Sequence, residues 1–291
     1  MKIRALLIGL LTLPAAFGGL AAQAQLRAPW DSVGRILRTT GSLTGGYHRY
    51  AWPRRDIVLR VGDVTVATAL ALGSWAGFDG KASATTMMGD LVVTADELKP
   101  VLAELASQRI GVSAIHNHLV GEPQITYVHF HADGDAIDLA TRLDRVLART
   151  KTPRPVAARA PQPATIDTAI VFATLGLRGR AHGNIAQVST VLVQGSVTMD
   201  GRTLNPALAY GSPINIQVVD GGRAVATGDF SLTAAQVAPV LNALAAHGIA
   251  ATALHSHWIG EQPTIYYMHF WADGPLPDVL RGLRAALDAA R

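Results

Sequence analysis

The segment MGDLVVTADELKPVLAEL (residues 88–105) recurs 139 residues later as TGDFSLTAAQVAPVLNAL (residues 227–244). Both segments have a Gly-Asp pair after their first residue and continue into the same helix-like pattern. The period far exceeds the roughly 20–50 residues of stacked solenoid repeats. The sequence therefore predicts a tandem duplication of one whole domain.

The match extends beyond these segments towards the C-terminal side of each copy. IHNHLVGE (residues 115–122) becomes LHSHWIGE (residues 254–261), and HFHADG (residues 129–134) becomes HFWADG (residues 269–274). A single inserted residue near Gln262 is the only realignment required. Each copy thus carries the same histidine-rich pair of segments.

A proline-rich stretch separates the two copies. KTPRPVAARAPQP (residues 151–163) has no apolar periodicity, which is typical of a stiff, exposed linker. We therefore predict a first repeat over residues 30–150 and a second repeat over residues 164–291.

The helices of each copy are predicted from capping patterns. Thr94 with Glu97 three residues later forms a capping-box pattern that opens a helix to about residue 108, and Thr233 with Gln236 does the same in the second copy. A closing helix is expected over residues 135–149, with Asp133-Gly134 as its turn and N-cap. Its counterpart in the second copy is residues 276–290, preceded by Asp273-Gly274.

The strands of each copy are predicted from alternating apolar residues. Residues 110–118 and 124–131 are expected to pair as an antiparallel hairpin, with His116 opposite about Tyr127. Further β-rich segments are 56–61 and 189–194. The predicted fold class is α+β, a tandem duplication in which each domain is a mainly antiparallel sheet covered by helices.

The N-terminus has the pattern of a secretory signal. Lys2 and Arg4 precede an apolar run that ends in the small-residue site Ala22-Gln23-Ala24. We expect a signal peptide over residues 1–24, no membrane span in the mature protein, and a periplasmic or secreted location. The resulting protein would act outside the cytoplasm.

Composition excludes several classes of function. The chain has no cysteine, so disulfides, thiolate metal sites and cysteine nucleophiles are absent. A formal net charge of +4 without a dense basic run argues against nucleic acid. No dinucleotide fingerprint or phosphate loop is present, so no nucleotide cofactor is expected.

The histidine-rich segments contain the candidate metal ligands. His116 and His118 leave the same face of a strand, Glu122 follows in the turn, and His129 returns on the partner strand. Three neutral imidazoles and a carboxylate suit Zn²⁺, Mn²⁺, Fe²⁺ or Cu²⁺. The candidate ligands are His116, His118, Glu122, His129 and His131 in the first copy, and His255, His257, Glu261 and His269 in the second.

Other interpretations remain open at this point. The histidines are equally compatible with a half-buried polar face, and the sequence does not decide whether a bound metal would catalyse a reaction. Five aromatic residues near the histidines suggest an alternative, a non-enzymatic envelope module that binds a glycan, peptide or small molecule. These residues are Tyr127, Trp258, Tyr266, Tyr267 and Trp271. Arg54, Arg55 and Asp56 would hold either an anionic group or a surface ion pair.

The chain resembles the LppY/LpqO family of exported bacterial proteins. The resemblance rests on the Gly-Asp helix start, on AIHNH (residues 114–118) with its following glutamate, and on the HFxADG segments, all duplicated after a signal-like N-terminus. The family is of unassigned function, so the resemblance implies export and a duplicated architecture without naming a reaction. Membrane tethering through an acylated cysteine is not expected, since no cysteine is present.

Overall fold

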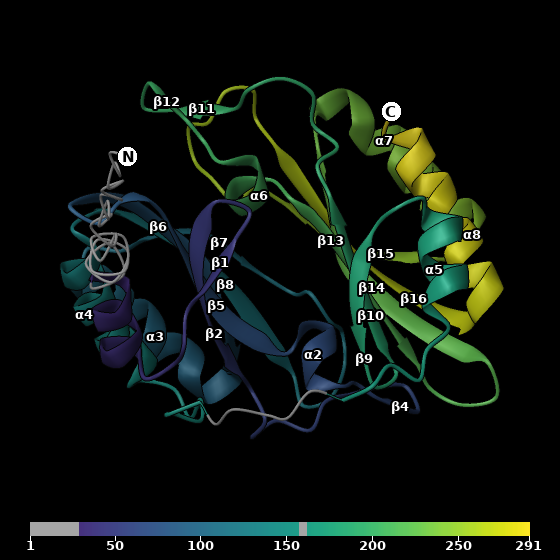
Figure 1. Cartoon of the computed structure of the whole chain (residues 1–291), viewed down its shortest axis with the longest axis horizontal. Helices are drawn as coiled ribbons and strands as arrows, with labels where there is room; N and C mark the ends of the chain where they lie inside the picture. The colour runs from purple at the N-terminus through teal and green to yellow at the C-terminus, as the bar shows by residue number, and fades with distance from the viewer. Residues whose placement is uncertain (1–28, 157–161) are drawn as a thin grey trace, which may run out of the picture.

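The computed structural model of the chain describes residues 29–156 and 162–291. Two six-stranded antiparallel sheets, one from each repeat, face each other, and helices cover their outer faces (Figure 1). The predicted signal peptide lies outside the described residues. Within them, no helix has both the length and the apolar character needed to cross a membrane.

The first sheet has the strand order β1-β2-β5-β6-β8-β7. Its edge hairpin shows the expected register, because His116 pairs with Tyr127 and Ala114 with His129. The strands are β1 (Ser42–Thr44), β2 (Tyr47–Pro53), β5 (Gly73–Lys81), β6 (Ala84–Thr94), β7 (Gly111–His116) and β8 (Ile125–Gly134).

The second sheet repeats this order as β9-β10-β13-β14-β16-β15. Its edge hairpin pairs His255 with Tyr267 and Ala253 with His269, the duplicated counterpart of the first register. The strands are β9 (Gly179–His182), β10 (Ile185–Thr190), β13 (Ser212–Val218), β14 (Arg223–Leu232), β15 (Ala250–His255) and β16 (Tyr266–Pro275).

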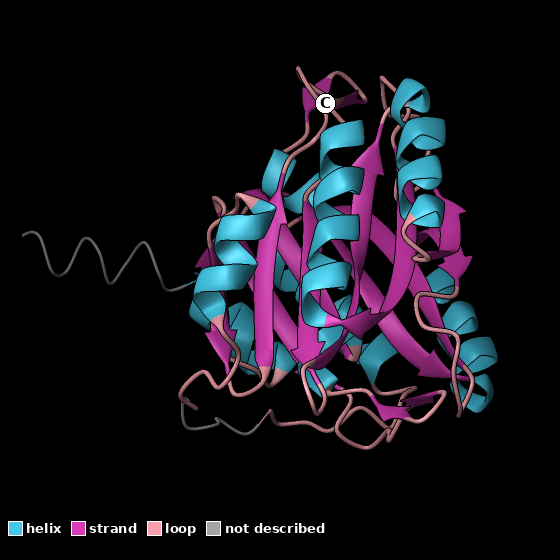
Figure 2. Ribbon diagram, turned by 90° about the vertical axis from the view of Figure 1, so that its right-hand side faces the viewer, coloured by secondary structure: helices cyan, strands magenta, loops and turns pink. Residues whose placement is uncertain are grey.

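Helices pack on the outer face of each sheet. The first repeat uses α3 (Ala95–Ser107), α4 (Ala136–Leu147) and a further helix over residues 29–37. The second uses α5 (Thr168–Leu175), α7 (Ala234–Ala246) and α8 (Leu276–Ala289), which lie in front of the sheet in Figure 2. Each repeat therefore has an apolar core between its helices and its sheet.

Both predicted capping boxes are formed. The Thr94 backbone N–H donates to Glu97 Oε2 at 3.0 Å, and the Thr233 N–H donates to Gln236 Oε1 at 2.8 Å. These bonds satisfy amides that a helix start leaves without partners. The two helices consequently begin where the sequence predicted.

An arm from each repeat reaches towards the other repeat. The first arm holds β3 (Arg60–Val61), β4 (Val64–Thr65) and α2 (Thr68–Ala71), and the second holds β11 (Thr198–Met199), β12 (Arg202–Thr203) and α6 (Pro206–Ala209). Two apolar clusters join these arms to residues of the opposite repeat. Apolar clusters that contain residues of both repeats therefore close the space between the two sheets at both ends.

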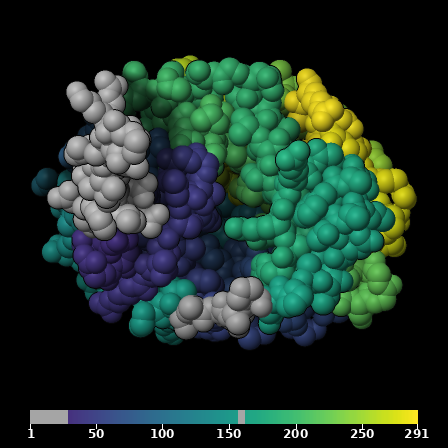
Figure 3. Space-filling model, in the orientation of Figure 1, coloured from purple at the N-terminus to yellow at the C-terminus, as the bar shows by residue number. Residues whose placement is uncertain are grey.

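The packing of the second arm depends on Gly77 in the first sheet. A Cβ atom on Gly77 would lie 2.2 Å from Leu208 Cδ1, so only glycine leaves room for the Leu208 side chain. Asn205 Nδ2 also donates to the Gly45 carbonyl at 3.2 Å. In the space-filling view the purple first-repeat segment and the green second-repeat segment meet on this side (Figure 3).

Some local expectations were wrong. Asp133 and Gly134 lie within β8, and Asp273 and Gly274 within β16, so neither pair caps a helix. Asp135 caps α4 instead, accepting from the Ile137 N–H at 2.9 Å. An aspartate side chain can accept from the first-turn amides only from the residue that directly precedes the helix.

The other differences concern extended segments. Of the expected strand over residues 56–61, only β3 (Arg60–Val61) forms. Of the expected strand over residues 189–194, only the first two residues belong to a strand, because β10 ends at Thr190. The start of the proline-rich segment is exposed at Lys151, Pro153 and Pro155, but it is anchored locally, because Thr152 is buried and the Lys151 N–H donates to Glu97 Oε1 at 2.6 Å. Residues 157–161 lie outside the described part of the chain.

Candidate metal centre

The inner faces of the two sheets carry the histidines. In β8, Val128 and Phe130 point into the helix-covered core, so His129 points to the opposite face, towards the other repeat. The duplication places His269 in the same position on β16. Histidines of both repeats are therefore directed into one space.

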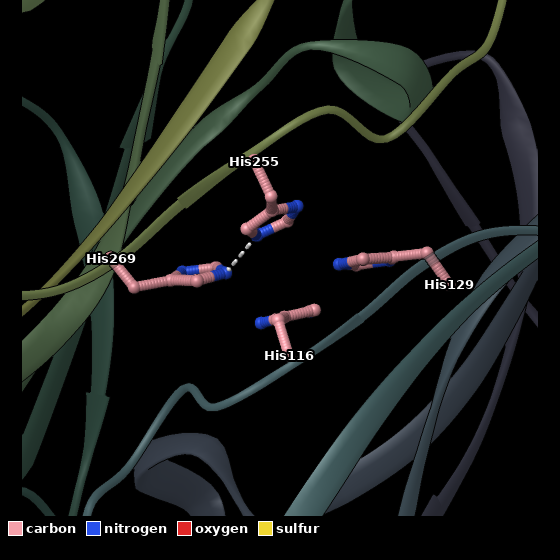
Figure 4. Close-up of side chains that lie close together, drawn as sticks. All are labelled: His116, His129, His255 and His269. Atoms are coloured by element: carbon pink, nitrogen blue, oxygen red, sulfur yellow. Dashed lines mark hydrogen bonds between the residues drawn. The ribbon is translucent and has the colours of Figure 1, made fainter.

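Four of these residues, the central histidines, converge there (Figure 4). One ligand atom from each of His116, His129, His255 and His269 lies within 4.8 Å of the others. The rings of His116 and His255 stack with centroids 3.9 Å apart, and His255 Nε2 lies 2.7 Å from His269 Nε2. The sequence predicted one ligand set per repeat, whereas the structure brings residues of both sets together.

Backbone carbonyls assign the tautomers of two central histidines. His116 Nδ1 lies 3.1 Å from the Asn117 carbonyl oxygen, and His255 Nδ1 lies 3.0 Å from that of Ser256. A carbonyl only accepts, so each Nδ1 carries the proton and each Nε2 is left with a lone pair. His116 Nε2 is buried without a hydrogen-bond partner.

Two aspartates flank the central histidines, and sequence reasoning did not single them out. Asp229 Oδ1 lies 2.7 Å from His269 Nδ1, and the duplicated Asp90 Oδ1 lies 3.8 Å from His129 Nδ1. Both belong to the Gly-Asp pairs that recur in the two copies. That recurrence was the signal that would have found them, because nothing in a helix start requires an aspartate there.

His118 and His257, the outer histidines, lie against the central ones. The His118 ring lies 3.9 Å from that of His269, and the His257 ring lies 3.7 Å from that of His129. His118 Nε2 also lies 3.1 Å from Asp229 Oδ1, which places His118, Asp229 and His269 in a second compact group of potential ligands.

The remaining candidate ligands lie outside both groups. Glu122 is exposed in the hairpin turn, and Glu261 is buried but accepts a hydrogen bond from the Ile265 N–H at 2.9 Å. His131 lies beside Trp258, with 5.6 Å between their ring centroids. These three residues therefore have surroundings unlike those of the central histidines.

Burial favours the neutral form of three central histidines, His116, His129 and His255. Burial together with His129, His269 and His255 lowers the pKa of His116, and burial and His269 lower the pKa of His255 to about 4. Burial and His255 likewise hold the pKa of His129 well below its ordinary value. Neutral imidazole is the form that binds metals.

The pKa values of the two aspartates are shifted in opposite directions. Burial would raise the pKa of Asp229, but the adjacent His269 and His118 outweigh it and hold that pKa well below the usual range. Burial and the nearby Asp229 raise the pKa of Asp90 well above its usual range. The duplicated carboxyl groups thus have unequal environments.

The aromatic residues do not form an exposed platform. Tyr127, Trp258 and Tyr267 are buried, and Tyr267 stacks on His257 with ring centroids 3.4 Å apart. They pack around the histidines and fix their ring planes. The interpretation as a stacking surface for a glycan was therefore wrong for these three side chains.

Arg54 is also part of the interior. Its fully buried guanidinium donates to Glu97 Oε2 at 2.7 Å and to Asp56 Oδ2 at 2.8 Å. It joins the segment after β2 to the start of α3, and both carboxylates are already engaged. This arrangement is a structural ion pair within the first repeat.

Comparisons with known proteins identify a family whose function is unknown. No curated protein matches the chain. Among solved structures, a fused permuted hexameric shell protein of the RMM microcompartment matches at 15% identity and a TM-score of 0.19, covering 72% of this chain and 86% of its own. EtuB from Clostridium kluyveri matches at 13% identity and a TM-score of 0.21, covering 86% of this chain and 89% of its own.

A family model matches the chain twice, over residues 31–149 and 169–289, one match in each repeat. The two matches span most of the chain and agree with the duplication seen in the sheets and helices. The chain belongs to the family described as Domain of Unknown Function (DUF1259).

Proposed function

We propose that the protein binds a divalent transition metal ion, Zn²⁺, Mn²⁺, Fe²⁺ or Cu²⁺, at the central histidines. The observation that carries the proposal is the convergence of four buried imidazoles from two repeats, with ligand atoms within 4.8 Å of one another. Imidazole nitrogen is a preferred ligand of these ions. Each repeat contributes two of the four.

The hydrogen-bond partners of His269 support a cation at this position. His255 Nε2 is an acceptor, so His269 Nε2 must donate to it across 2.7 Å. His269 Nδ1 also faces Asp229 Oδ1 at 2.7 Å and must donate there too. A neutral imidazole has a single N–H and can meet only one of these two demands.

A metal ion removes this requirement. Bound to the lone pairs of His255 Nε2 and His269 Nε2, it leaves a neutral His269 whose Nδ1–H donates to Asp229. A carboxylate that accepts from a metal-bound histidine fixes the ring and raises its basicity. Asp229 is therefore proposed as a positioning residue and not as a ligand of the central ion.

The spacing of the four side chains suits one ion. Zinc binds imidazole nitrogen at about 2.0–2.1 Å, so two ligands of one ion lie at most about 4.2 Å apart. All four ligand atoms lie within 4.8 Å of one another, so none has to move closer to another by more than roughly half an ångström, which small ring rotations provide. The 2.7 Å contact of His255 with His269 must widen correspondingly.

Elemental analysis tests the proposal. The protein, purified without a histidine tag, is incubated with Zn²⁺, Cu²⁺ or Mn²⁺, dialysed and analysed beside the double variant His116→Ala/His255→Ala. We expect bound metal in the wild type and its loss in the variant. His247→Ala is the control, because His247 is exposed and lies outside the cluster. A metal-free wild type after all three incubations would refute the proposal.

We also propose, from the sequence alone, that the protein is exported and related to the LppY/LpqO proteins. The support is the signal-like N-terminus and the shared motifs. N-terminal sequencing of the protein from the culture medium or periplasm tests export. Residue 25 as the first residue is the expected result, and an intact Met1 would contradict it.

A further inference from the structure

The space between the two sheets is open to solvent along one edge. The inner-face residues Trp75 of β5 and Asn215 of β13 are half-buried, although both strands have a neighbour on each side. Solvent therefore reaches these two side chains from between the sheets. The space-filling view shows a hollow there, between the purple residues of β1 and β2 and the teal residues of β9 and β10 (Figure 3). We call it the inter-sheet groove; its walls include Arg49, Trp75, Arg180, Gln187 and Asn215.

The two arms close the ends of the inter-sheet groove. At one end, Asn205 Nδ2 of the second arm donates to the Gly45 carbonyl at 3.2 Å. At the other end, Gln187 Nε2 donates to the Ala69 carbonyl of the first arm at 3.1 Å. A polymer lying along the groove would need open ends. The groove is therefore suited to a small molecule that enters from the open edge.

Arg49 places a cation in the inter-sheet groove. Its neighbours on β2, Tyr50 and Trp52, point into the helix-covered core, so Arg49 points to the inner face. Its guanidinium carbon lies 4.0 Å from the centroid of the Trp75 ring. A guanidinium stacked on an aromatic ring keeps its in-plane N–H donors available. Tyr47 is a hydrogen-bond neighbour, and Arg49 forms no ion pair with a carboxylate in the described part of the chain.

Arg180 adds a second cation from the other repeat. Ala186 and Val188 belong to the helix-covered core, so Gln187 between them points to the inner face. Arg180 lies opposite Gln187 in the β9–β10 pair, and its Nε donates to Gln187 Oε1 at 3.0 Å. Burial lowers the pKa of Arg49 and the charge of Arg180 lowers it further, so the two guanidinium groups are within electrostatic reach of each other.

Two cations that share a groove favour an anion between them. Guanidinium groups bind carboxylate and phosphate through pairs of N–H···O bonds. The side chains of Gln187 and Asn215 are hydrogen-bonded at 2.9 Å and make the adjoining wall polar. A bound anion would offset the repulsion between Arg49 and Arg180, whereas a neutral apolar molecule would leave it in place.

The inter-sheet groove adjoins the central histidines. Trp75 pairs with Asp90 on the next strand, and Asp90 pairs with His129 on the strand after that. Residues directly opposite each other share a face of the sheet, so all three side chains lie on the inner face. Neighbouring strands are about 4.8 Å apart, which puts Trp75 about 10 Å from His129 across two strands. A small molecule bound at the arginines therefore lies beside the candidate metal centre.

We propose that the inter-sheet groove binds a small organic anion, whose carboxylate or phosphate group is held by Arg49 and Arg180 and whose remaining part is presented to the central metal ion. The anion site stands on the groove and its two arginines alone. The presentation to the ion rests on the proposed function, because it requires metal at the central histidines.

Isothermal titration calorimetry at low ionic strength tests the anion site. Succinate and inorganic phosphate are titrated separately into protein that has been stripped of metal and dialysed free of chelator, so that the two titrations distinguish a carboxylate from a phosphate ligand. We expect at least one anion to bind, and Arg49→Gln and Arg180→Gln each to weaken its binding by about tenfold or more, which corresponds to one lost hydrogen bond to a charged group.

Arg35→Gln is the matched control, because it removes the same charge from an exposed position on the outer helix of the first repeat. Its affinity for the anion should equal that of the wild type. Thermal melting verifies that each variant is folded, and the exposed Arg180 keeps the test valid if Arg49→Gln does not fold. Absence of binding by both anions would overturn the proposal, as would equal affinities in the wild type, Arg49→Gln and Arg180→Gln.

Repeating the succinate titration with zinc-loaded protein tests the link to the metal. We expect tighter binding than in the metal-free protein, and no such gain in His116→Ala/His255→Ala. Equal affinities with and without zinc would overturn the presentation of the anion to the ion while leaving the anion site intact. A wild type that binds succinate but no zinc would refute the proposed function and not the anion site.

Discussion

Acidification should destabilise the metal-free protein strongly. His255 has a pKa of about 4 in the folded chain, against an ordinary value of 6.5. Between these pH values the unfolded chain takes up a proton that the folded chain does not, so stability falls as the pH decreases through this window. Burial lowers the pKa of His116, His118, His129 and His257 in the same direction.

The magnitude follows from the shift. Each unit of pKa difference corresponds to about 1.36 kcal/mol, so lowering the pH from 7 to 5 should remove about 2 kcal/mol through His255 alone. The assay is urea denaturation in the presence of a chelator at both pH values. In His255→Asn the loss should be about 2 kcal/mol smaller. Equal free energies of unfolding at pH 7 and pH 5 in the wild type would refute the reasoning.

Three further predictions concern packing and can be measured by the same denaturation assay at pH 7. Gly77→Ala should destabilise the protein by about 1–3 kcal/mol because the new methyl group overlaps the Leu208 side chain. An unchanged urea midpoint would show that the second arm does not depend on close packing at Gly77. Arg54→Ala should cost about 3–5 kcal/mol, since it leaves Glu97 buried without its cation, and a loss below 1 kcal/mol would contradict this. Thr94→Ala should cost about 1 kcal/mol through the lost cap, and a more stable variant would argue against the capping box.

The fold class and the hairpin register could be predicted from the sequence because they depend on local patterns. The repeated capping boxes at Thr94 and Thr233 and the alternation through His116 fix helix starts and strand faces within a short stretch of chain. The arms could not be predicted in this way. Apolar residues of segments such as 56–61 belong to a cluster that also includes Val225 of the opposite repeat, and residues that complete such a shared core give no periodic signal of their own.

The candidate site was predicted in its residue types but not in its arrangement. The spacing of the histidines predicted which strand face carries them. It could not predict which residues of the other repeat lie opposite that face. The four central histidines meet only because the two sheets face each other, which is a property of long-range packing. Asp90 and Asp229 were missed because they lie on strands β6 and β14, outside the histidine-rich segments that drew attention.

The crossing arms have a consequence for how the chain unfolds. Leu208 of the second arm packs against Tyr47 of the first repeat, and the first arm packs against Val225 of the second. These two apolar clusters contain residues of both repeats, so separating the repeats would expose apolar surface on both. A gene duplication normally leaves two units that can melt one after the other, but here the arms couple them, and we expect a single calorimetric transition for the two described repeats.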